Sequence, residues 1–135
     1  MCIFPDDRAE PVFTEEVVWD PRNQPDPQYH YDEIMAGLKS APAHLPRVDA
    51  VGGSSAGAII NNRVMAASLF RAGPRDIFNA RVKDIFLSIG RAWGVPLEVA
   101  NDGDVTALAG AMWLNEDSVL GIAMGSSEAA GYVDG

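Results

Sequence analysis

The sequence predicts an α/β protein in which helices flank a mixed, largely parallel sheet. Two patterns predict this class. Short apolar segments that suit buried strands alternate along the chain with longer segments whose apolar residues recur at helical spacing. Such alternation is typical of parallel strands joined by helices. The 135 residues, 47% of them apolar, are enough to bury one core.

The first third of the chain predicts one clear helix. Residues 12–13 and 17–19 suit short strand pieces. Residues 20–27 contain three prolines, which remove backbone donors and favour extended geometry, so an exposed connector is expected there. A helix is expected over residues 31–39, because the apolar side chains share one face and acidic residues lie near its N-terminus.

The middle of the chain predicts a strand, a hairpin and a long helix. Residues 48–53 are expected to form a short buried strand that runs into a glycine-rich turn. Residues 58–66 predict a hairpin that turns at the pair Asn61–Asn62, because asparagine tolerates positive φ. Residues 75–92 carry apolar side chains at helical spacing, and Gly94 ends that helix.

The last third predicts a strand, a helix and two further strands. Residues 97–100 suit a short strand, and residues 101–104 form a polar turn that can cap the next helix. That helix is expected over residues 105–114, where small side chains allow a neighbour to pack closely. A buried strand is expected at 118–124 and a further strand at 130–133.

Composition and charge exclude several classes of protein. The formal net charge is -9, from 19 acidic and 10 basic side chains, so the surface repels nucleic acid and anionic membranes. No apolar run approaches the roughly 18 residues that span a bilayer, and the first residues lack the pattern of a signal peptide. A single cysteine, Cys2, excludes an internal disulfide and a cysteine-cluster zinc site. We expect a cytoplasmic protein with no metal site of its own.

Three polar turns follow predicted strands, at residues 52–57, 101–104 and 125–127. Ligands of α/β sheets gather at the carboxyl ends of strands. If the first two strands are neighbours in one sheet, their turns share an edge. This convergence predicts where a binding site lies.

Two of these turns carry candidate chemistry. The carboxylate of Asp102 can take a proton from a substrate hydroxyl, which Asn101 can orient through a hydrogen bond. The alternative is that both residues only cap a helix. The turn Gly125, Ser126 and Ser127 offers backbone N–H groups and hydroxyls that can cradle a phosphate, although a tight turn between strands needs the same residues.

The first turn also matches the G-x-S-x-G pattern of serine hydrolases, with Ser55 as the nucleophile. A dyad of Ser55 and Asp102 would resemble patatin-like lipases. Three observations oppose this alternative. A hairpin, not a helix, is expected after Ser55, both histidines (His30 and His44) precede it, and no glycine-rich oxyanion segment lies upstream.

Three segments of the chain resemble the ROK family of sugar kinases and related repressors. Residues 48–57 (VDAVGGSSAG) look like that family's strand and glycine turn. Residues 95–110 (VPLEVANDGDVTALAG) resemble its VPVxVENDxNAAALxE segment, and residues 119–133 (VLGIAMGSSEAAGYV) resemble its LGTGxGGGI phosphate segment. The three occur in family order and span about two-thirds of the chain.

The resemblance implies a ribonuclease-H-like, actin-type ATPase fold whose two lobes close over a sugar and ATP. It implies that Asp102 is the general base, that Asn101 binds a second sugar hydroxyl, and that Gly125, Ser126 and Ser127 line the ATP phosphates. Mg²⁺ would screen those phosphates during transfer. The expected partners are therefore a sugar substrate and ATP, and neither nucleic acid nor a membrane.

The chain also departs from the family pattern. The first phosphate loop, DxGGTxxR/K, is absent, and Gly125–Ser127 replaces the usual Gly-Thr-Gly. The chain therefore resembles the middle of a longer kinase: residues 1–117 as the later part of the N-terminal lobe and 118–135 as the first strands of the second lobe. We expect little kinase activity from these residues alone, and association into a homodimer or larger. The altered loop leaves a non-catalytic, sugar-sensing member of the family as an alternative.

Overall fold

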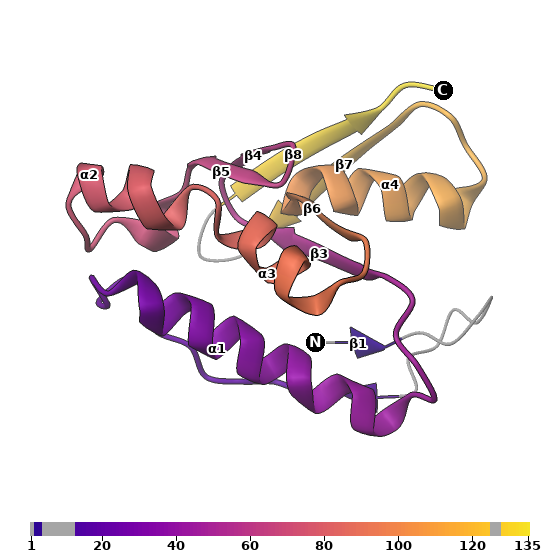
Figure 1. Cartoon of the computed structure of the whole chain (residues 1–135). Helices are drawn as coiled ribbons and strands as arrows, with labels where there is room; N and C mark the ends of the chain where they lie inside the picture. The colour runs from indigo at the N-terminus through magenta and orange to yellow at the C-terminus, as the bar shows by residue number, and fades with distance from the viewer. Residues whose placement is uncertain (1, 4–12, 125–127) are drawn as a thin grey trace.

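The computed structural model describes residues 2–3, 13–124 and 128–135. Two strands form its centre (Figure 1). Strand β3 (Val51–Ser55) pairs in parallel with β6 (Leu97–Asn101), in a register that runs from Val51 opposite Leu97 to Ser55 opposite Asn101. These two strands are therefore neighbours in one sheet, which is the condition under which their turns share an edge. The first strand begins at Val51 rather than at residue 48, because residues 47–50 are in no regular element.

The predicted hairpin is also confirmed. Strand β4 (Ala58–Ile60) pairs antiparallel with β5 (Arg63–Ala66). The turn between them is made by Asn61 and Asn62, with φ values of 50° and 60°. Asparagine accepts this left-handed geometry at low cost, so the local sequence alone decides the turn.

The prediction of a largely parallel sheet is wrong. The described residues form four two-stranded sheets, of which β3–β6 is the parallel one. The other three are antiparallel: β4–β5, β1 (Cys2–Ile3) with β2 (Phe13–Thr14), and β7 (Val119–Met124) with β8 (Glu128–Val133). Short connections join β4 to β5 and β7 to β8, and antiparallel neighbours need no crossover. Residues 17–19 are not in a strand. The coarse α/β class stands.

Helix α1 (Pro27–Ser40) begins earlier than residue 31. The last of the three prolines is its first residue, where the missing N–H costs nothing. The side chain of Asp26 accepts a hydrogen bond from the Gln28 backbone N–H at 2.9 Å and so caps the first turn. The proline-rich segment is therefore an exposed connector that ends in a helix start. A short 3₁₀ helix, η1 (Ala41–His44), follows α1.

The long helix predicted over residues 75–92 is interrupted. It divides into α2 (Arg75–Ile77), a π-helical turn η3 (Phe78–Val82) and α3 (Ile85–Trp93). The break follows from strand β5, because the Val64 N–H donates to the Lys83 carbonyl at 2.9 Å. An ion pair between Arg63 and Asp84, 3.1 Å long, supports the same junction. Gly94 ends α3 in the left-handed conformation, with φ 70°, as predicted.

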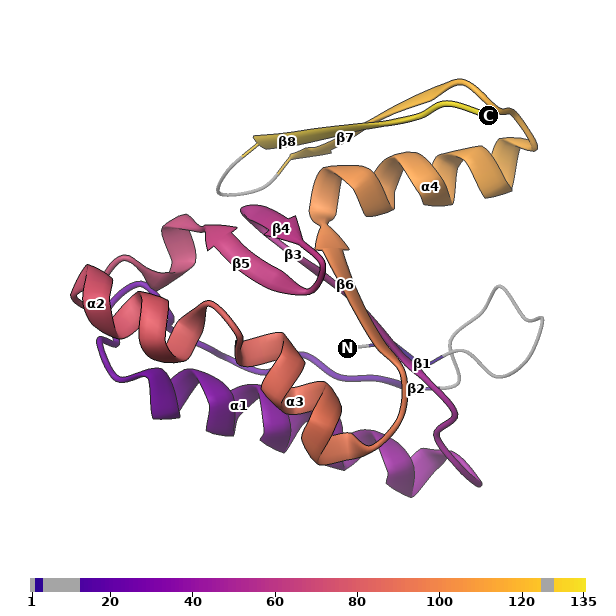
Figure 2. The same cartoon turned by 45° about the horizontal axis from the view of Figure 1, so that its top comes forward.

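One hydrophobic core lies between β3–β6, the β4–β5 hairpin and the helices α1 and α3 (Figure 2). α1 and α3 lie side by side against this core. A short 3₁₀ helix, η2 (Ser68–Phe70), closes one end of it. The buried apolar residues of the core are Val64, Phe70, Val82, Ile85, Phe86, Ile89 and Val99.

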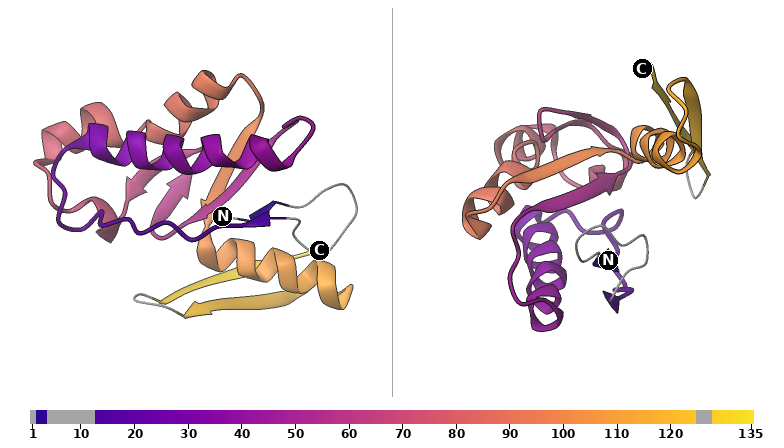
Figure 3. Two further views of the ribbon diagram at one scale, coloured as in Figure 1. Left: turned by 90° about the horizontal axis from the view of Figure 1, so that it is seen from below. Right: turned by 90° about the vertical axis from the view of Figure 1, so that its right-hand side faces the viewer.

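The C-terminal elements form a second layer (Figure 3). Helix α4 (Asp102–Leu114) lies along the β7–β8 hairpin, and it begins at residue 102 rather than 105 because Asn101 caps it. The predicted close packing is confirmed. A Cβ on Gly121 would lie 2.2 Å from the Ala107 nitrogen, and one on Gly131 would lie 2.4 Å from the Asp104 Cα.

Strands β7 and β8 are buried on one face only. The inward side chains alternate with exposed ones, so the prediction of a buried strand at 118–124 is wrong for its outer face. The expected domain boundary after residue 117 falls between α4 and β7, and as a domain boundary it stays a prediction. In the part of the chain that the structure describes, no helix is long and apolar enough to cross a bilayer.

Candidate functional site

The parallel pairing of β3 and β6 brings two of the three predicted turns to one edge. Ser55 and Asn101, the last residues of the two strands, are register partners. The side chain of Asn101 crosses to the glycine turn, where its Nδ2 donates to the Gly57 carbonyl at 2.7 Å. The expectation that these turns share an edge is therefore confirmed.

Asn101 has a structural role at this edge. Its Oδ1 accepts the Gly103 backbone N–H at 2.9 Å, which makes it the N-cap of α4. The helix-cap alternative thus holds for Asn101. A carboxamide has two donor hydrogens and two acceptor lone pairs. One donor and one acceptor site of Asn101 are used, so one of each remains for a ligand hydroxyl.

Asp102 is the first residue of α4 and is half-buried. Its Oδ1 accepts the Gly103 N–H at 3.2 Å, in addition to the shorter bond to Asn101. Its backbone carbonyl accepts the Thr106 hydroxyl at 2.8 Å. The N-terminus of a helix favours a negative charge, so this position suits a carboxylate that accepts hydrogen bonds.

The start of α4 also touches the hairpin that contains the third turn. A Cβ on Gly103 would lie 2.6 Å from the Ala130 carbonyl carbon and 2.9 Å from that of Ala129. Glu128, just before these alanines, pairs with Met124. The phosphate-binding residues predicted from the sequence, Gly125, Ser126 and Ser127, lie outside the described residues.

The predicted nucleophile Ser55 is at the end of β3. Its hydroxyl is 3.4 Å from the Ala56 carbonyl oxygen, a long hydrogen bond to its own neighbour. The chain continues into the β4–β5 hairpin and not into a helix, so the strand–turn–helix geometry of a nucleophile elbow is missing. Both histidines are occupied elsewhere.

The two histidines pack against aromatic rings of the N-terminal half. His44 stacks on Phe13, with ring centroids 3.7 Å apart. His30 is 2% exposed and lies edge-on to Trp19, Tyr29 and Phe70. Its Nε2 donates to the Gln24 carbonyl at 3.1 Å. Burial lowers the pKa of His30 below its ordinary value of 6.5, although the hydrogen bond to Gln24 and the charge of Asp26 oppose the shift.

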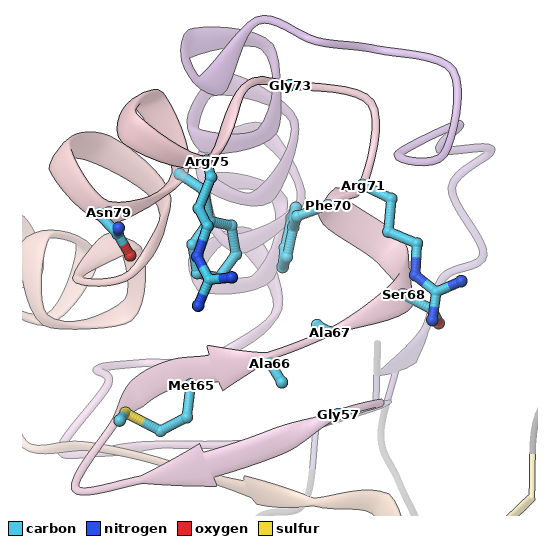
Figure 4. A pocket seen from close by; sticks show the side chains of 11 residues that line it. Gly57, Met65, Ala66, Ala67, Ser68, Phe70, Arg71, Gly73, Arg75 and Asn79 are labelled. Carbon is cyan, nitrogen blue, oxygen red and sulfur yellow. The ribbon is translucent and has the colours of Figure 1, made fainter.

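Sequence reasoning missed a pocket beside the edge (Figure 4). Its volume is about 530 Å³, and it lies between the β4–β5 hairpin, η2 and α2. Gly57 belongs to its wall, so the pocket adjoins the turn to which Asn101 is bonded. Two arginines, Arg71 and Arg75, bracket the Gly73-Pro74 turn at its rim. That bracketing is the only signal of the pocket in the sequence.

Comparison with known proteins found no matching family model, no similar curated protein and no similar solved structure. Within residues 2–3, 13–124 and 128–135, no group of three or more His, Cys, Asp or Glu side chains is arranged to hold a metal ion.

Proposed function

We propose that this chain is part of a ROK-type carbohydrate kinase, which transfers the γ-phosphoryl group of ATP to a sugar hydroxyl. One observation supports this proposal most. The parallel β3–β6 pair brings Asn101 and Asp102 to a sheet edge beside the glycine turn. The proposal includes a ribonuclease-H-like, actin-type fold for the whole kinase, divided after residue 117.

In this proposal Asp102 is the general base. Its carboxylate accepts the proton of the attacking sugar hydroxyl, and general-base assistance of this kind contributes about 10²–10⁴ in rate. Asn101 orients a neighbouring hydroxyl through the donor and acceptor sites that the structure leaves open. Its two existing bonds hold the Asn101 side chain in place, so that side chain does not have to be ordered when the sugar binds.

The start of α4 also fits an anionic co-substrate. This helix is 13 residues long, and its N-terminus favours negatively charged groups. ATP, when bound, supplies the phosphoryl group, and Mg²⁺ neutralises its charge. In this proposal Gly125, Ser126 and Ser127 line the phosphates, as the resemblance to the kinase family implies.

The experiment compares two carboxylate-to-amide substitutions in the first turn of α4. Asp102→Asn keeps a hydrogen-bonding group and removes the base, whereas Asp104→Asn makes the same change at an exposed side chain. ADP release is measured over a panel of hexoses and amino sugars, in the 135-residue chain and in the longest protein that the gene encodes. We expect turnover in the longer protein to fall about 100-fold or more for Asp102→Asn and to stay within about twofold for Asp104→Asn.

Two results would contradict the proposal. Unchanged turnover in Asp102→Asn leaves the residue with a role in the helix start only. Robust turnover by the 135-residue chain contradicts the expectation of little activity, which rests on the absence of a first phosphate loop from these residues. Sugar binding without turnover in the longer protein supports the alternative of a sugar sensor, which the Gly-Ser-Ser loop favours. The hydrolase alternative is not proposed, since Ser55 lacks the elbow geometry.

Self-association belongs to the same proposal. The outer face of the β7–β8 hairpin exposes four large apolar side chains, Leu120, Ile122, Met124 and Tyr132. An exposed apolar face and unpaired strand edges both favour association with a second copy. Light scattering should give a dimer or larger, which Ile122→Lys weakens and Val18→Lys, at an exposed valine far along the sequence, does not. A monomer at high concentration contradicts this.

A further inference from the structure

The pocket beside the Asn101–Asp102 edge is basic, although the protein is acidic. Among the residues that the structure describes, two arginines line it, Arg71 and Arg75, and no carboxylate does. The chain as a whole carries a net charge of -9. Two cations in an otherwise acidic protein are a local reversal of charge, and such a reversal attracts anions to one place on the surface.

Neither arginine is neutralised by a neighbour. Two other arginines of the chain form ion pairs, Arg47 with Asp49 and Arg63 with Asp84. In the part of the chain that the structure describes, Arg71 and Arg75 have no ion pair and no side-chain hydrogen bond. In Figure 4 the two side chains lie on either side of the Phe70 ring, with Arg75 above the end of β5 and Arg71 beside Ser68. Their donors are therefore available to a ligand.

The rest of the wall suits a ligand with both apolar and polar parts. Phe70 and Phe78 supply aromatic rings, and Ser68 and Asn79 supply hydrogen-bonding groups. The carbon face of a sugar ring packs on an aromatic side chain, and its hydroxyls need polar partners. A guanidinium group binds a carboxylate or phosphate through two parallel hydrogen bonds.

The pocket is connected to the proposed base by one residue. Gly57 lines the pocket, and its carbonyl accepts the hydrogen bond from Asn101. Gly57 has no room for a side chain, because a Cβ would lie 2.4 Å from the Ala66 carbonyl oxygen and its φ is 111°. The wall of the pocket therefore keeps a fixed position relative to the residue that precedes Asp102.

We propose that this pocket binds the anionic group of the carbohydrate substrate, so that the protein acts on a sugar phosphate or a sugar acid and not on a neutral sugar. This inference rests on the proposed kinase function and adds the substrate class. Arg71 and Arg75 bind the phosphate or carboxylate, and the aromatic rings contact the sugar carbons. The hydroxyl to be phosphorylated then lies towards Asp102.

Calorimetric titration of the 135-residue chain tests the proposal without relying on activity. The probes are glucose 6-phosphate, glucuronate, glucose and inorganic phosphate. We expect both anionic sugars to bind at least about tenfold more tightly than glucose and than phosphate alone. Raising the salt concentration from about 0.05 to 0.5 M should weaken the anionic sugars and leave glucose unchanged.

Three single variants assign the effect to the pocket. Arg71→Gln and Arg75→Gln should each weaken the anionic sugars about fivefold to tenfold, whereas Arg71→Lys, which keeps the charge, should lose less. Arg22→Gln is the matched control, since Arg22 is an exposed arginine outside the pocket. Circular dichroism and melting temperature show that each variant is folded.

The outcomes separate this inference from the kinase proposal. Equal binding of glucose and glucose 6-phosphate, or equal effects of Arg71→Gln and Arg22→Gln, overturns the anionic substrate. Binding of inorganic phosphate as tight as that of the sugar phosphate also overturns it, because the pocket then takes a free anion. Arginine-dependent binding of sugar phosphates with unchanged turnover in Asp102→Asn supports the pocket and contradicts the kinase. Turnover of neutral sugars that depends on Asp102 but not on the arginines supports the kinase and contradicts the anionic substrate.

Discussion

The two layers of the molecule are held together in different ways. The core around β3–β6 buries large branched side chains, with Ile89 fully buried and Ile85 almost so. The layer of α4 and β7–β8 buries mainly backbone, glycine and alanine, such as Ala107 and Gly121, and turns its large side chains outward. Side-chain burial stabilises the first layer, and close backbone approach sets the geometry of the second.

The proposed site lies where these two kinds of packing meet. Asn101 is the last residue of β6, and Asp102 is the first of α4. The Asn101 side chain is bonded to Gly57 in the first layer, and Gly103 touches Ala130 in the second. The side-chain core of the first layer and the close backbone contacts of the second layer therefore fix this pair of residues from two sides. Substitutions in either layer should move the pair for different physical reasons.

The largest effect is expected from adding one methyl group to the second layer. In Gly121→Ala the new Cβ would meet backbone atoms of α4 at 2.2 Å and 2.5 Å, so the helix and the hairpin must separate. Overpacking that moves backbone is costly, and we expect a loss of about 4 kcal/mol or more in the free energy of unfolding. Urea unfolding and amide exchange in β7 measure it.

Gly52→Ala is the matched control for that change. Gly52 is in β3, and nothing lies within 4 Å of its Cβ position. The same substitution there should change the free energy of unfolding by less than about 1 kcal/mol. Equal losses in the two variants would show that close backbone approach does not distinguish the layers.

The next largest effect is expected in the first layer, from removing a large side chain rather than adding a small one. Ile89→Ala removes a fully buried side chain of the first layer and should cost about 3–4 kcal/mol in urea unfolding. Ile122→Ala makes the same change on the outer face of the second layer, where the isoleucine is 56% exposed. In dilute protein, at a concentration where light scattering shows a monomer, it should cost less than about 1 kcal/mol. If Ile122→Ala costs as much as Ile89→Ala, the outer face is buried in the protein as it exists in solution.

A smaller effect is expected where the hairpin docks on the central pair. Asn62 donates to the Leu97 carbonyl at 3.1 Å and accepts the Val99 N–H at 2.7 Å, so its amide pairs with β6 as a neighbouring strand would. Asn62→Ala leaves both backbone groups without that partner and should cost about 2 kcal/mol. Asn61→Ala is the control. It also places alanine at a positive φ, so the difference between the two variants leaves out the strain in the turn. A difference near zero between these variants rules out docking through the amide.

Local signals predicted part of this architecture. The turn at Asn61–Asn62 and the helix stop at Gly94 depend on the conformational preferences of single residues, so the sequence was sufficient there. The break after Val82 was not predicted, because Val64, which is distant in sequence, takes the Lys83 carbonyl. Helical periodicity carries no information about such a competing donor. The antiparallel pairing and the exposed outer face of β7–β8 likewise depend on which elements become neighbours.

The same limit applies to the candidate site. The sheet edge was predictable, because polar turns after two strands converge when the strands pair in parallel. The double role of Asn101 was not, since its bond to Gly57 depends on the exact register. The basic pocket was missed because its walls come from β5, η2 and α2, which are brought together only by folding. The two arginines are informative only because no carboxylate among the described residues lines the pocket with them.

The smallest effect concerns pH, and it belongs to the first layer. His30 packs against Trp19 and Phe70 in this layer, and burial lowers its pKa below 6.5. Its Nδ1 is buried without a hydrogen-bond partner, so the folded protein offers a second proton no acceptor. Between the lowered pKa and 6.5, the unfolded chain therefore binds more protons than the folded one, and stability rises with pH in that window. Below the lowered pKa both states bind the proton, and the stability lost on acidification through His30 no longer increases.

Urea unfolding between about pH 5 and 7.5 should show this slope, since most carboxylates titrate at lower pH. His30→Phe replaces one buried ring by another and should remove the slope, even if it changes the stability itself through the lost bond to Gln24. His44→Gln is the control, because His44 is exposed and its loss should leave the slope in place. Amide exchange locates the effect: acid should open α1 before β7–β8, a hairpin that contains no histidine. Equal slopes in wild type and His30→Phe would mean that another group carries the pH dependence, and the two layers would then not differ in their response to acid.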